Sequence, residues 1–199
     1  MAGAVKILGL TGGIGMGKSN AAKVLRSVGV PVFDADATVH RLQGCGGAAV
    51  KPIGVAFPGS ISNGAVDRGA LRAAVLEDKG ALKRLERIVH PLVRQAERRF
   101  LAQARRARRR LVALDIPLLF ETGGADRVDH IVVVSAPPAT QRARVRRRGT
   151  MSAAQIAAVI GRQMADAEKR RRADTVVRTG LSRGHTQRQL RRLVRQLRS

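Results

Sequence analysis

The residues best suited to chemistry lie in a glycine-rich loop near the start of the chain, which matches the pattern G-x-x-x-x-G-K-[ST]. Glycines let the backbone turn tightly and bring N–H groups against phosphate oxygens, and the following helix points its positive end at the same anion. Lys18 is placed to reach the β- and γ-phosphates, and the Ser19 hydroxyl to ligate Mg²⁺. The loop consists of Gly12, Gly13, Ile14, Gly15, Met16, Gly17, Lys18 and Ser19, and Asn20 follows it. It predicts a nucleoside triphosphate site with Mg²⁺, without separating kinases from GTPases or ATPases.

Two carboxylates, Asp34 and Asp36, follow the second apolar run of the chain. In open α/β sheets, ligands bind beyond the carboxyl ends of the strands. Along an extended chain these two side chains point the same way. One of them can accept the proton of an attacking hydroxyl or hold a Mg²⁺-bound water, whereas the alternative is that one merely caps the next helix. We assign the chemistry to Asp36 and a structural or supporting role to Asp34.

Further polar candidates follow the third apolar run. Asp115 comes directly after Leu111–Leu114, as in a Walker B strand, and can bind Mg²⁺ through water. Glu121 follows shortly after and is a second candidate. For both carboxylates a structural role is an equal alternative.

A cationic lid is predicted by the spacing of Gln141, Arg144 and Arg148, which fall at i, i+3 and i+7 on one helical face. Phosphoryl transfer depends mostly on positioning and on stabilising negative charge, and arginines supply both. For the neighbouring Arg146 and Arg147, a solvated surface position is an equal alternative.

Five short apolar or β-branched runs alternate with helical stretches and must position these residues. They are Val5–Leu10, Val30–Phe33, Leu111–Leu114, Ile131–Val134 and Thr175–Val177. Nearly continuous hydrophobic strands are typical of a parallel sheet buried on both faces. The pattern predicts an α/β fold: a P-loop NTPase-type doubly wound sheet of about five parallel strands.

The sequence also indicates the first and the last helix of the chain. The first runs from the glycine loop to about Val28, with Gly29 ending it as the C′ residue. The last carries an apolar stripe with helical spacing, formed by Leu190, Leu193, Val194 and Leu197. We expect the last helix to pack on the sheet.

The remaining segments predict insertions within one domain spanning residues 1–199. The nucleotide core takes about 1–37, 111–137 and 173–199. A mostly helical insertion takes about 38–110, with helical patterning from Arg68 onward. An arginine-rich lid takes about 138–172, where Ser152 and Gln155 predict a capping-box start for a helix.

Composition narrows the class of protein. The single cysteine, Cys45, suits a reducing compartment, and the start of the chain lacks the features of a signal peptide, so we expect a cytoplasmic protein. No apolar run approaches the ~20 residues needed to span a bilayer. The net charge of +24 attracts polyanions, but the chain has no Trp or Tyr and four Phe, which leaves few platforms for stacking bases. We therefore expect no specific nucleic-acid partner and no membrane, and we favour a monomer.

Taken in order, these blocks resemble the dephospho-coenzyme A kinase family over essentially the whole chain. The blocks are LTGGIGMGKS, VFDAD, FPGSISNGAVDRGALR, IVHPLVR, LDIPLLFE, the set Gln141, Arg144 and Arg148, and K-x-x-x-AD at 169–174. The resemblance implies ATP-dependent phosphorylation of the ribose 3′-hydroxyl of dephospho-CoA, the last step of coenzyme A synthesis. It also implies the three-part build of core, acceptor-binding insertion and lid.

The resemblance also implies roles for single residues. Asp36 matches the family's proposed catalytic base, Lys18 and Ser19 match its phosphate and Mg²⁺ ligands, and Arg144 and Arg148 match its lid arginines. On the acceptor side, His90 matches a position near the acceptor pocket, with helix-end packing beside Pro91 as an equal alternative.

The chain departs from the family pattern in three places. Met16 stands where the family usually has serine, which loses a hydroxyl near phosphate, and Asn20 stands where it usually has threonine. The tail ADTVVRTG lacks an asparagine that many members carry near adenine, so the adenine contacts stay open.

Two other functions remain as alternatives. Another P-loop kinase for a nucleoside, nucleotide or sugar would share the loop and the lid. A basic nucleic-acid-binding protein is suggested by the net charge.

Overall fold

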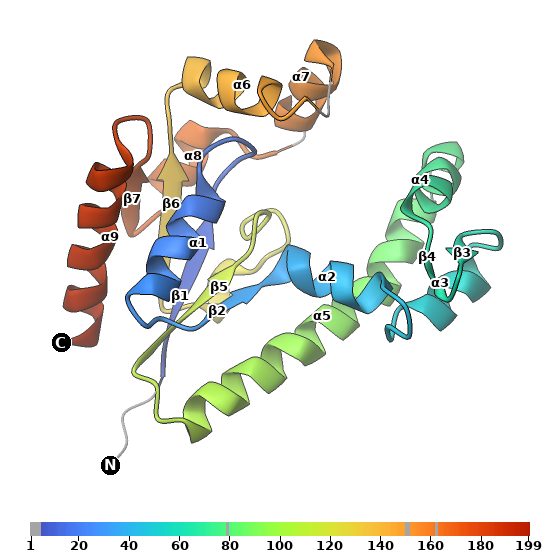
Figure 1. Ribbon diagram of the computed structural model, residues 1–199, viewed down its shortest axis with the longest axis horizontal. Coiled ribbons are helices and arrows are strands. Elements are labelled where there is room, and N and C mark those ends of the chain that lie inside the picture. Colours follow the sequence, from blue (N-terminus) through green and yellow to red (C-terminus); the bar gives the residue numbers. More distant parts are fainter. Residues whose placement is uncertain (1–4, 79, 150–151, 162) are drawn as a thin grey trace. The chain divides into compact units, whose positions relative to one another are not determined.

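The computed structural model describes residues 5–78, 80–149, 152–161 and 163–199. Within these residues, five strands form one sheet in the order β2-β5-β1-β6-β7 (Figure 1). The strands are β1 (Lys6–Thr11), β2 (Val32–Asp34), β5 (Leu111–Asp115), β6 (His130–Ser135) and β7 (Thr175–Arg178). β1 pairs in parallel with β5 and β6, and β6 pairs in parallel with β7. The predicted parallel α/β sheet is confirmed.

The chain divides into two compact units. One comprises the chain up to Phe33 and from Ala104 onward, and the other comprises Asp34–Gln103. The second unit therefore begins and ends some residues before the predicted insertion of 38–110. The assignment of separate core, acceptor and lid segments stays a prediction.

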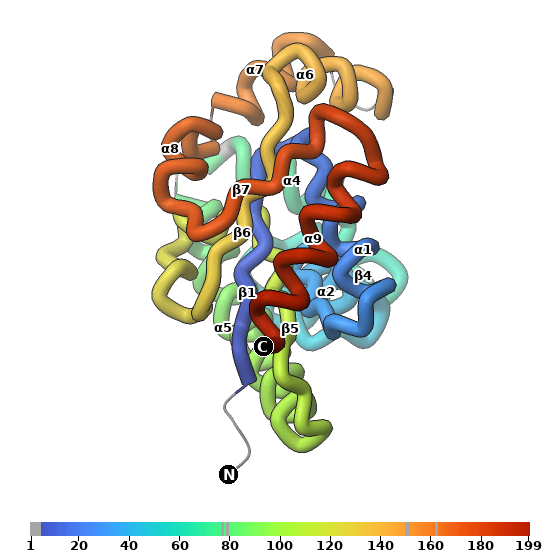
Figure 2. Tube along the Cα trace, turned by 90° about the vertical axis from the view of Figure 1, so that its left-hand side faces the viewer, coloured from blue at the N-terminus to red at the C-terminus, as the bar shows by residue number. Residues whose placement is uncertain are grey.

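One face of the sheet in the first unit is covered by α1 (Lys18–Ser27) and α9 (Arg183–Arg198). Leu8 and Leu10 of β1, Leu25 of α1 and Leu190 of α9 belong to one buried cluster. Figures 1 and 2 both show α9 lying along α1. The predicted apolar stripe of the last helix is confirmed as the surface that packs on this core, because a helix with one apolar face is stabilised mainly by burying it.

The predicted end of the first helix is also confirmed. Gly29 has φ +74°, and its N–H donates to Arg26 O, while the N–H of Val30 donates to Leu25 O. This pair of bonds is a Schellman motif, which needs a residue that adopts the left-handed conformation easily. It turns the chain back toward β2.

Within the described residues, three helices lie between β6 and β7: α6 (Pro138–Arg146), α7 (Ala153–Gly161) and α8 (Asp166–Arg171). A 3-10 turn, η1 (Ala125–Arg127), precedes β6. The predicted capping box is confirmed: Ser152 N–H donates to Gln155 Oε1 (2.8 Å), and Gln155 N–H donates to Ser152 Oγ (3.3 Å).

The second unit has its own core. Its elements are α2 (Ala35–Gln43), α3 (Val50–Ala56), the antiparallel pair β3 (Ile61–Ser62) and β4 (Ala65–Val66), α4 (Arg68–Glu77) and α5 (Ala81–Arg106), the last of which ends in the first unit. Ile53, Phe57 and Leu71 pack with Val89 in one buried cluster. No helix of the described residues is long and apolar enough to cross a membrane.

Candidate functional site

The glycine loop joins β1 to α1 and depends on two glycines for its shape. Gly15 has φ +76°, and a Cβ there would lie 2.8 Å from Gln141 O. Gly17 is the N-cap of α1 with φ +96°, and a Cβ there would lie 3.0 Å from Thr179 Oγ1. Other residues would be strained at both positions and would also clash. The loop is therefore closely fitted to the segments around it.

Lys18 and Asp115 form an ion pair at the edge where the strands end. Lys18 Nζ donates to Asp115 Oδ1 at 2.6 Å, and the side chains are 16% and 3% exposed. The register of the sheet sets Leu10, just before the loop, beside Asp115 at the end of β5. Because parallel strands end at one edge, the structure brings these two predicted residues together. Binding of Mg²⁺ by Asp115 through water stays a prediction.

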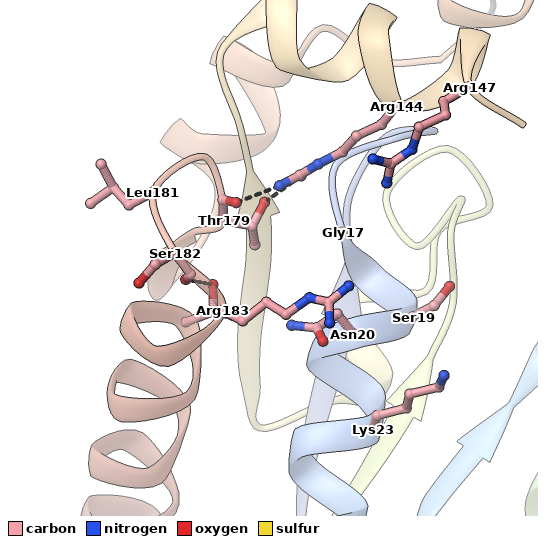
Figure 3. A pocket seen from close by; sticks show the side chains of 11 residues that line it. Gly17, Ser19, Asn20, Lys23, Arg144, Arg147, Thr179, Leu181, Ser182 and Arg183 are labelled. Carbon is pink, nitrogen blue, oxygen red and sulfur yellow. Dashed lines mark hydrogen bonds between the residues drawn. The ribbon is translucent and has the colours of Figure 1, made fainter.

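Arg144 reaches from α6 to the opposite side of the loop. Its Nη2 donates to Thr179 O at 2.6 Å, its Nη1 donates to Thr179 Oγ1 at 3.1 Å, and Nη1 lies 3.4 Å from Gly15 O (Figure 3). The guanidinium is therefore held by fixed acceptors. This placing accords with the role predicted for Arg144 over a bound phosphate, which stays a prediction.

A cavity of about 360 Å³ lies at the start of α1 and is lined by parts of α1, α6 and α9. Four cations line it: Lys23, Arg144, Arg147 and Arg183. Figure 3 shows the Arg183 side chain extending from α9 toward the start of α1, where Asn20 lies. Among the described residues no carboxylate lines this cavity, so its electrostatics suit an anion.

The lid arginines differ from the prediction in one respect. α6 ends at Arg146, and Arg148 lies beyond that end and is exposed. Arg147, which the sequence left open between lid and surface, lines the cavity instead. Because α6 ends two residues before Arg148, no helical turn places Arg148 on the same helix face as Arg144. The phosphate-binding role of Arg148 stays a prediction.

Gln141 and Gln163 hold the backbone of one loop residue, Ile14, from both sides along the chain. Gln141 Nε2 donates to Ile14 O at 2.9 Å, and Ile14 N–H donates to Gln163 Oε1 at 3.0 Å. Gln141 was found by its helical spacing. Gln163 carries no local signal, because its contact is made across the fold.

The expectation that Asp34 and Asp36 alternate along an extended chain is wrong. β2 ends at Asp34, and α2 begins at Ala35. Asp34 is the N-cap of α2, and its Oδ1 accepts the N–H of Ala37 at 2.9 Å, because a helix N-terminus needs such an acceptor. Asp36 therefore lies in the first helical turn and is exposed. The capping role agrees with the structural assignment of Asp34, and the chemical role of Asp36 stays a prediction.

Glu121 is engaged in structural contacts. Its Oε1 pairs with Lys169 Nζ at 2.8 Å and accepts the Met164 N–H at 3.0 Å, and Lys169 is 1% exposed and also donates to Pro117 O. Burial raises the pKa of the Glu121 carboxyl, but the hydrogen bonds from Lys169 and Met164 outweigh it and hold the pKa below its ordinary value. The pair fastens α8 to the loop after β5.

His90 lies within the second unit, in the middle of α5. The helix continues through Pro91 to Arg106, so the alternative of packing at a helix end is wrong. His90 is exposed and lines a groove of about 650 Å³ on that helix. The other residues lining the groove are Lys83, Glu86, Arg87, Pro91, Arg94 and Arg98. A role in acceptor binding stays a prediction.

Met16 does not face the hollow of the loop. Its side chain is 2% exposed, belongs to the core of the first unit, and accepts the N–H of Ala136 on its sulfur at 3.2 Å. The methionine side chain therefore turns into the core, and the expected loss of a hydroxyl near phosphate stays a prediction. Asn20 does line the cavity.

Thr179 was not among the predicted site residues. It comes directly after β7, is 5% exposed, and contacts both Arg144 and the loop. The rule that ligand sites lie beyond the carboxyl ends of strands could have found it, because the segment ADTVVRTG contains the fifth apolar run.

Comparison with known proteins places the chain among one group of enzymes. The family described as dephospho-CoA kinase matches residues 6–182. A dephospho-CoA kinase of Paramagnetospirillum magneticum is 62% identical over 83% of the chain and 78% of its own length. One of Gluconobacter oxydans is 51% identical over 98% of both chains.

Solved structures agree with the fold. The crystal structure of TT1252 from Thermus thermophilus superposes with a TM-score of 0.86 at 36% identity, covering 98% of this chain and 99% of that one. A dephospho-CoA kinase from Campylobacter jejuni has a TM-score of 0.72 at 22% identity, covering 96% of both chains, and supports the fold alone.

Proposed function

The chain belongs to the dephospho-CoA kinase family, and from this premise we propose that it transfers the γ-phosphoryl group of ATP to the ribose 3′-hydroxyl of dephospho-CoA, the final step of coenzyme A synthesis. In this step the 3′-oxygen forms a bond to phosphorus, the bond from phosphorus to the ADP oxygen breaks, and the hydroxyl proton is taken up by a base. The observation that carries the proposal is the convergence of Lys18 and Arg144 on one glycine loop beside a cationic cavity.

We place the phosphates of ATP, the phosphoryl donor, at the loop from Gly12 to Asn20. Lys18 and Arg144 stabilise negative charge that develops during transfer, with Arg148 as a further lid contact. The Ser19 hydroxyl holds Mg²⁺, with Asp115 acting through water. An exposed hydroxyl and a carboxylate on neighbouring elements are oxygen donors of the kind that Mg²⁺ prefers, and the ion supplies charge neutralisation when bound.

We assign the binding of dephospho-CoA, the phosphoryl acceptor, to the second unit. Asp36 takes the proton of the 3′-hydroxyl, with Asp34 fixing the start of α2 around it. The groove that contains His90 is lined by four cations and one carboxylate on one helix, and this excess of positive charge suits the pyrophosphate of the acceptor. The proposal includes a cytoplasmic location, supported by the single cysteine, and a monomer, which size-exclusion chromatography tests.

The test is an ADP-release assay with ATP and dephospho-CoA, with and without Mg²⁺. We expect ADP release that requires both dephospho-CoA and Mg²⁺. A preference for a nucleoside monophosphate, a nucleoside or a sugar over dephospho-CoA would overturn the acceptor assignment in favour of another small-molecule kinase. Tight, salt-dependent binding of DNA or RNA that survives Lys18→Ala, without turnover, would favour the nucleic-acid-binding alternative.

A further inference from the structure

Thr179 connects three parts of the first unit through one residue. Its backbone N–H donates to Ser135 O at the end of β6 (2.8 Å), its hydroxyl lies 2.5 Å from Met16 O in the glycine loop, and its two oxygens accept from Arg144. The residue is 5% exposed. The end of the sheet, the loop and the lid helix therefore meet at a buried junction.

The direction of each hydrogen bond at this junction follows from the chemistry of its groups. An arginine can only donate, and a backbone carbonyl can only accept. Arg144 Nη1 must therefore donate to Thr179 Oγ1, which leaves the single hydroxyl proton to be donated to Met16 O, the shorter of its two carbonyl contacts. The chain of bonds runs one way, from guanidinium to hydroxyl to loop. A cation at its head polarises the hydroxyl and strengthens the bond to the loop.

The bond from Thr179 also fixes the orientation of one peptide group of the loop, between Met16 and Gly17. The C=O and N–H of a trans peptide point to opposite sides, so fixing Met16 O on Thr179 turns the N–H of Gly17 away from Thr179. A Cβ on Gly17 would lie 3.2 Å from Thr179 Cβ and 3.4 Å from Arg144 Nη1. This close fit leaves the loop little freedom to shift without moving both residues.

We propose that Thr179 is a positioning residue that couples Arg144 to the glycine loop, so that the lid arginine and the loop present their donors to the triphosphate as one unit. The inference rests on the proposed function in that the triphosphate is the ligand of both. Its energetic basis is preorganisation, because donors held before the reaction cost no reorganisation during it. Thr179 itself is not required to touch the nucleotide.

The test is a double-mutant cycle between Thr179→Val and Arg144→Ala. Valine keeps the shape of threonine and removes the hydroxyl. We expect Thr179→Val to lower kcat/KM by about tenfold or more, and to have an effect several-fold smaller when Arg144 is already alanine. Thr179→Ser restores the hydroxyl and should return kcat/KM to within about threefold of the wild type. Additive effects in the cycle, or no rescue by serine, would overturn the coupling.

A matched control separates coupling from a loss of packing. Thr11 is fully buried, and its hydroxyl donates to Pro117 O at 3.0 Å. Thr11→Val removes a buried hydroxyl of the same kind, so its effect should add to that of Arg144→Ala. If it instead couples as strongly as Thr179→Val, the cycle reports general destabilisation and the inference fails. Thr179→Ala replaces Thr179→Val in the cycle if the valine variant does not fold by circular dichroism.

A second readout distinguishes this inference from the proposed function. The same cycle is measured by calorimetric binding of Mg²⁺ with the non-hydrolysable analogue AMP-PNP, without an acceptor. Coupling in binding, in an enzyme that fails to phosphorylate dephospho-CoA, would uphold the role of Thr179 and refute the acceptor. Phosphorylation of dephospho-CoA by the wild type, with no coupling in either kcat/KM or binding, would refute the role of Thr179 alone.

Discussion

Lys18 Nζ and Asp115 Oδ1 lie 2.6 Å apart, so the lysine of the phosphate loop is tied to the end of the neighbouring strand. The carboxylate is 3% exposed. Removing Lys18 therefore has two effects: the proposed phosphate site loses a cation, and the buried Asp115 carboxylate loses its ion-pair partner.

Lys18→Ala should therefore abolish turnover and also lower the free energy of unfolding, by about 1–3 kcal/mol. In the double variant Lys18→Ala/Asp115→Asn we expect much of the stability to return while turnover stays lost. The measurements are ADP release and urea unfolding. An unchanged rate in Lys18→Ala would refute the proposed mechanism, and equal stability of the single and double variants would refute the account of the pair.

Asp36→Asn should lower turnover by about 10²–10⁴ if Asp36 is the base. Because Asp36 is exposed in the first turn of α2, the substitution should change the free energy of unfolding little. Asp34→Asn is the matched control, because asparagine caps a helix about as well as aspartate. It should keep most of the activity. If the two variants lose activity equally, the base is not Asp36 alone.

The pKa of Glu121 predicts how stability depends on pH. Because the folded-state pKa lies below the ordinary value of about 4.5, the unfolded chain binds a proton more readily than the folded chain. The ionised Glu121 carboxylate therefore contributes to the stability of the folded chain. This contribution is complete above the ordinary pKa of about 4.5 and is lost as the pH falls through the folded-state pKa. Glu121→Gln should remove this contribution, so the loss of stability as the pH falls below about 4.5 should become shallower.

The same substitution leaves the Lys169 ammonium buried, so Glu121→Gln should also cost about 1–3 kcal/mol at pH 7. The double variant Glu121→Gln/Lys169→Met is the control and should recover part of that loss. Urea unfolding across the pH range measures both effects. An acid slope unchanged in Glu121→Gln would show that other carboxyls cause it.

Met16→Ser should not improve the enzyme. It would replace a buried core side chain with a smaller polar one, at a cost of about 2–5 kcal/mol in unfolding free energy. Met16→Leu, which nearly conserves the volume, should cost less than about 1.5 kcal/mol. Thermal unfolding and ADP release below the melting range check both variants. A more active and equally stable Met16→Ser would mean that this side chain turns toward the phosphates.

Much of the fold was determined by the local pattern of the sequence. All five apolar runs overlap strands, the first helix begins and ends close to its predicted positions, and the predicted stripe of the last helix is buried, because apolar periodicity and the Gly29 signal are local. The loop from Gly12 to Ser19 was recognisable for the same reason. Its chemistry requires particular residue types at fixed spacing, and these are visible in the sequence without the fold.

Only the tertiary structure decided which residues far apart in the sequence form hydrogen bonds at the site. The bond from Thr179 to Met16 crosses 163 positions, and that from Gln163 to Ile14 crosses 149, so no local pattern could indicate them. Packing likewise decided that Met16 faces the core and that Arg147 rather than Arg148 lines the cavity. The glycine loop by itself predicts a nucleoside triphosphate site. What holds its backbone and its arginine in place depends on contacts that form only when distant segments meet at one edge of the sheet.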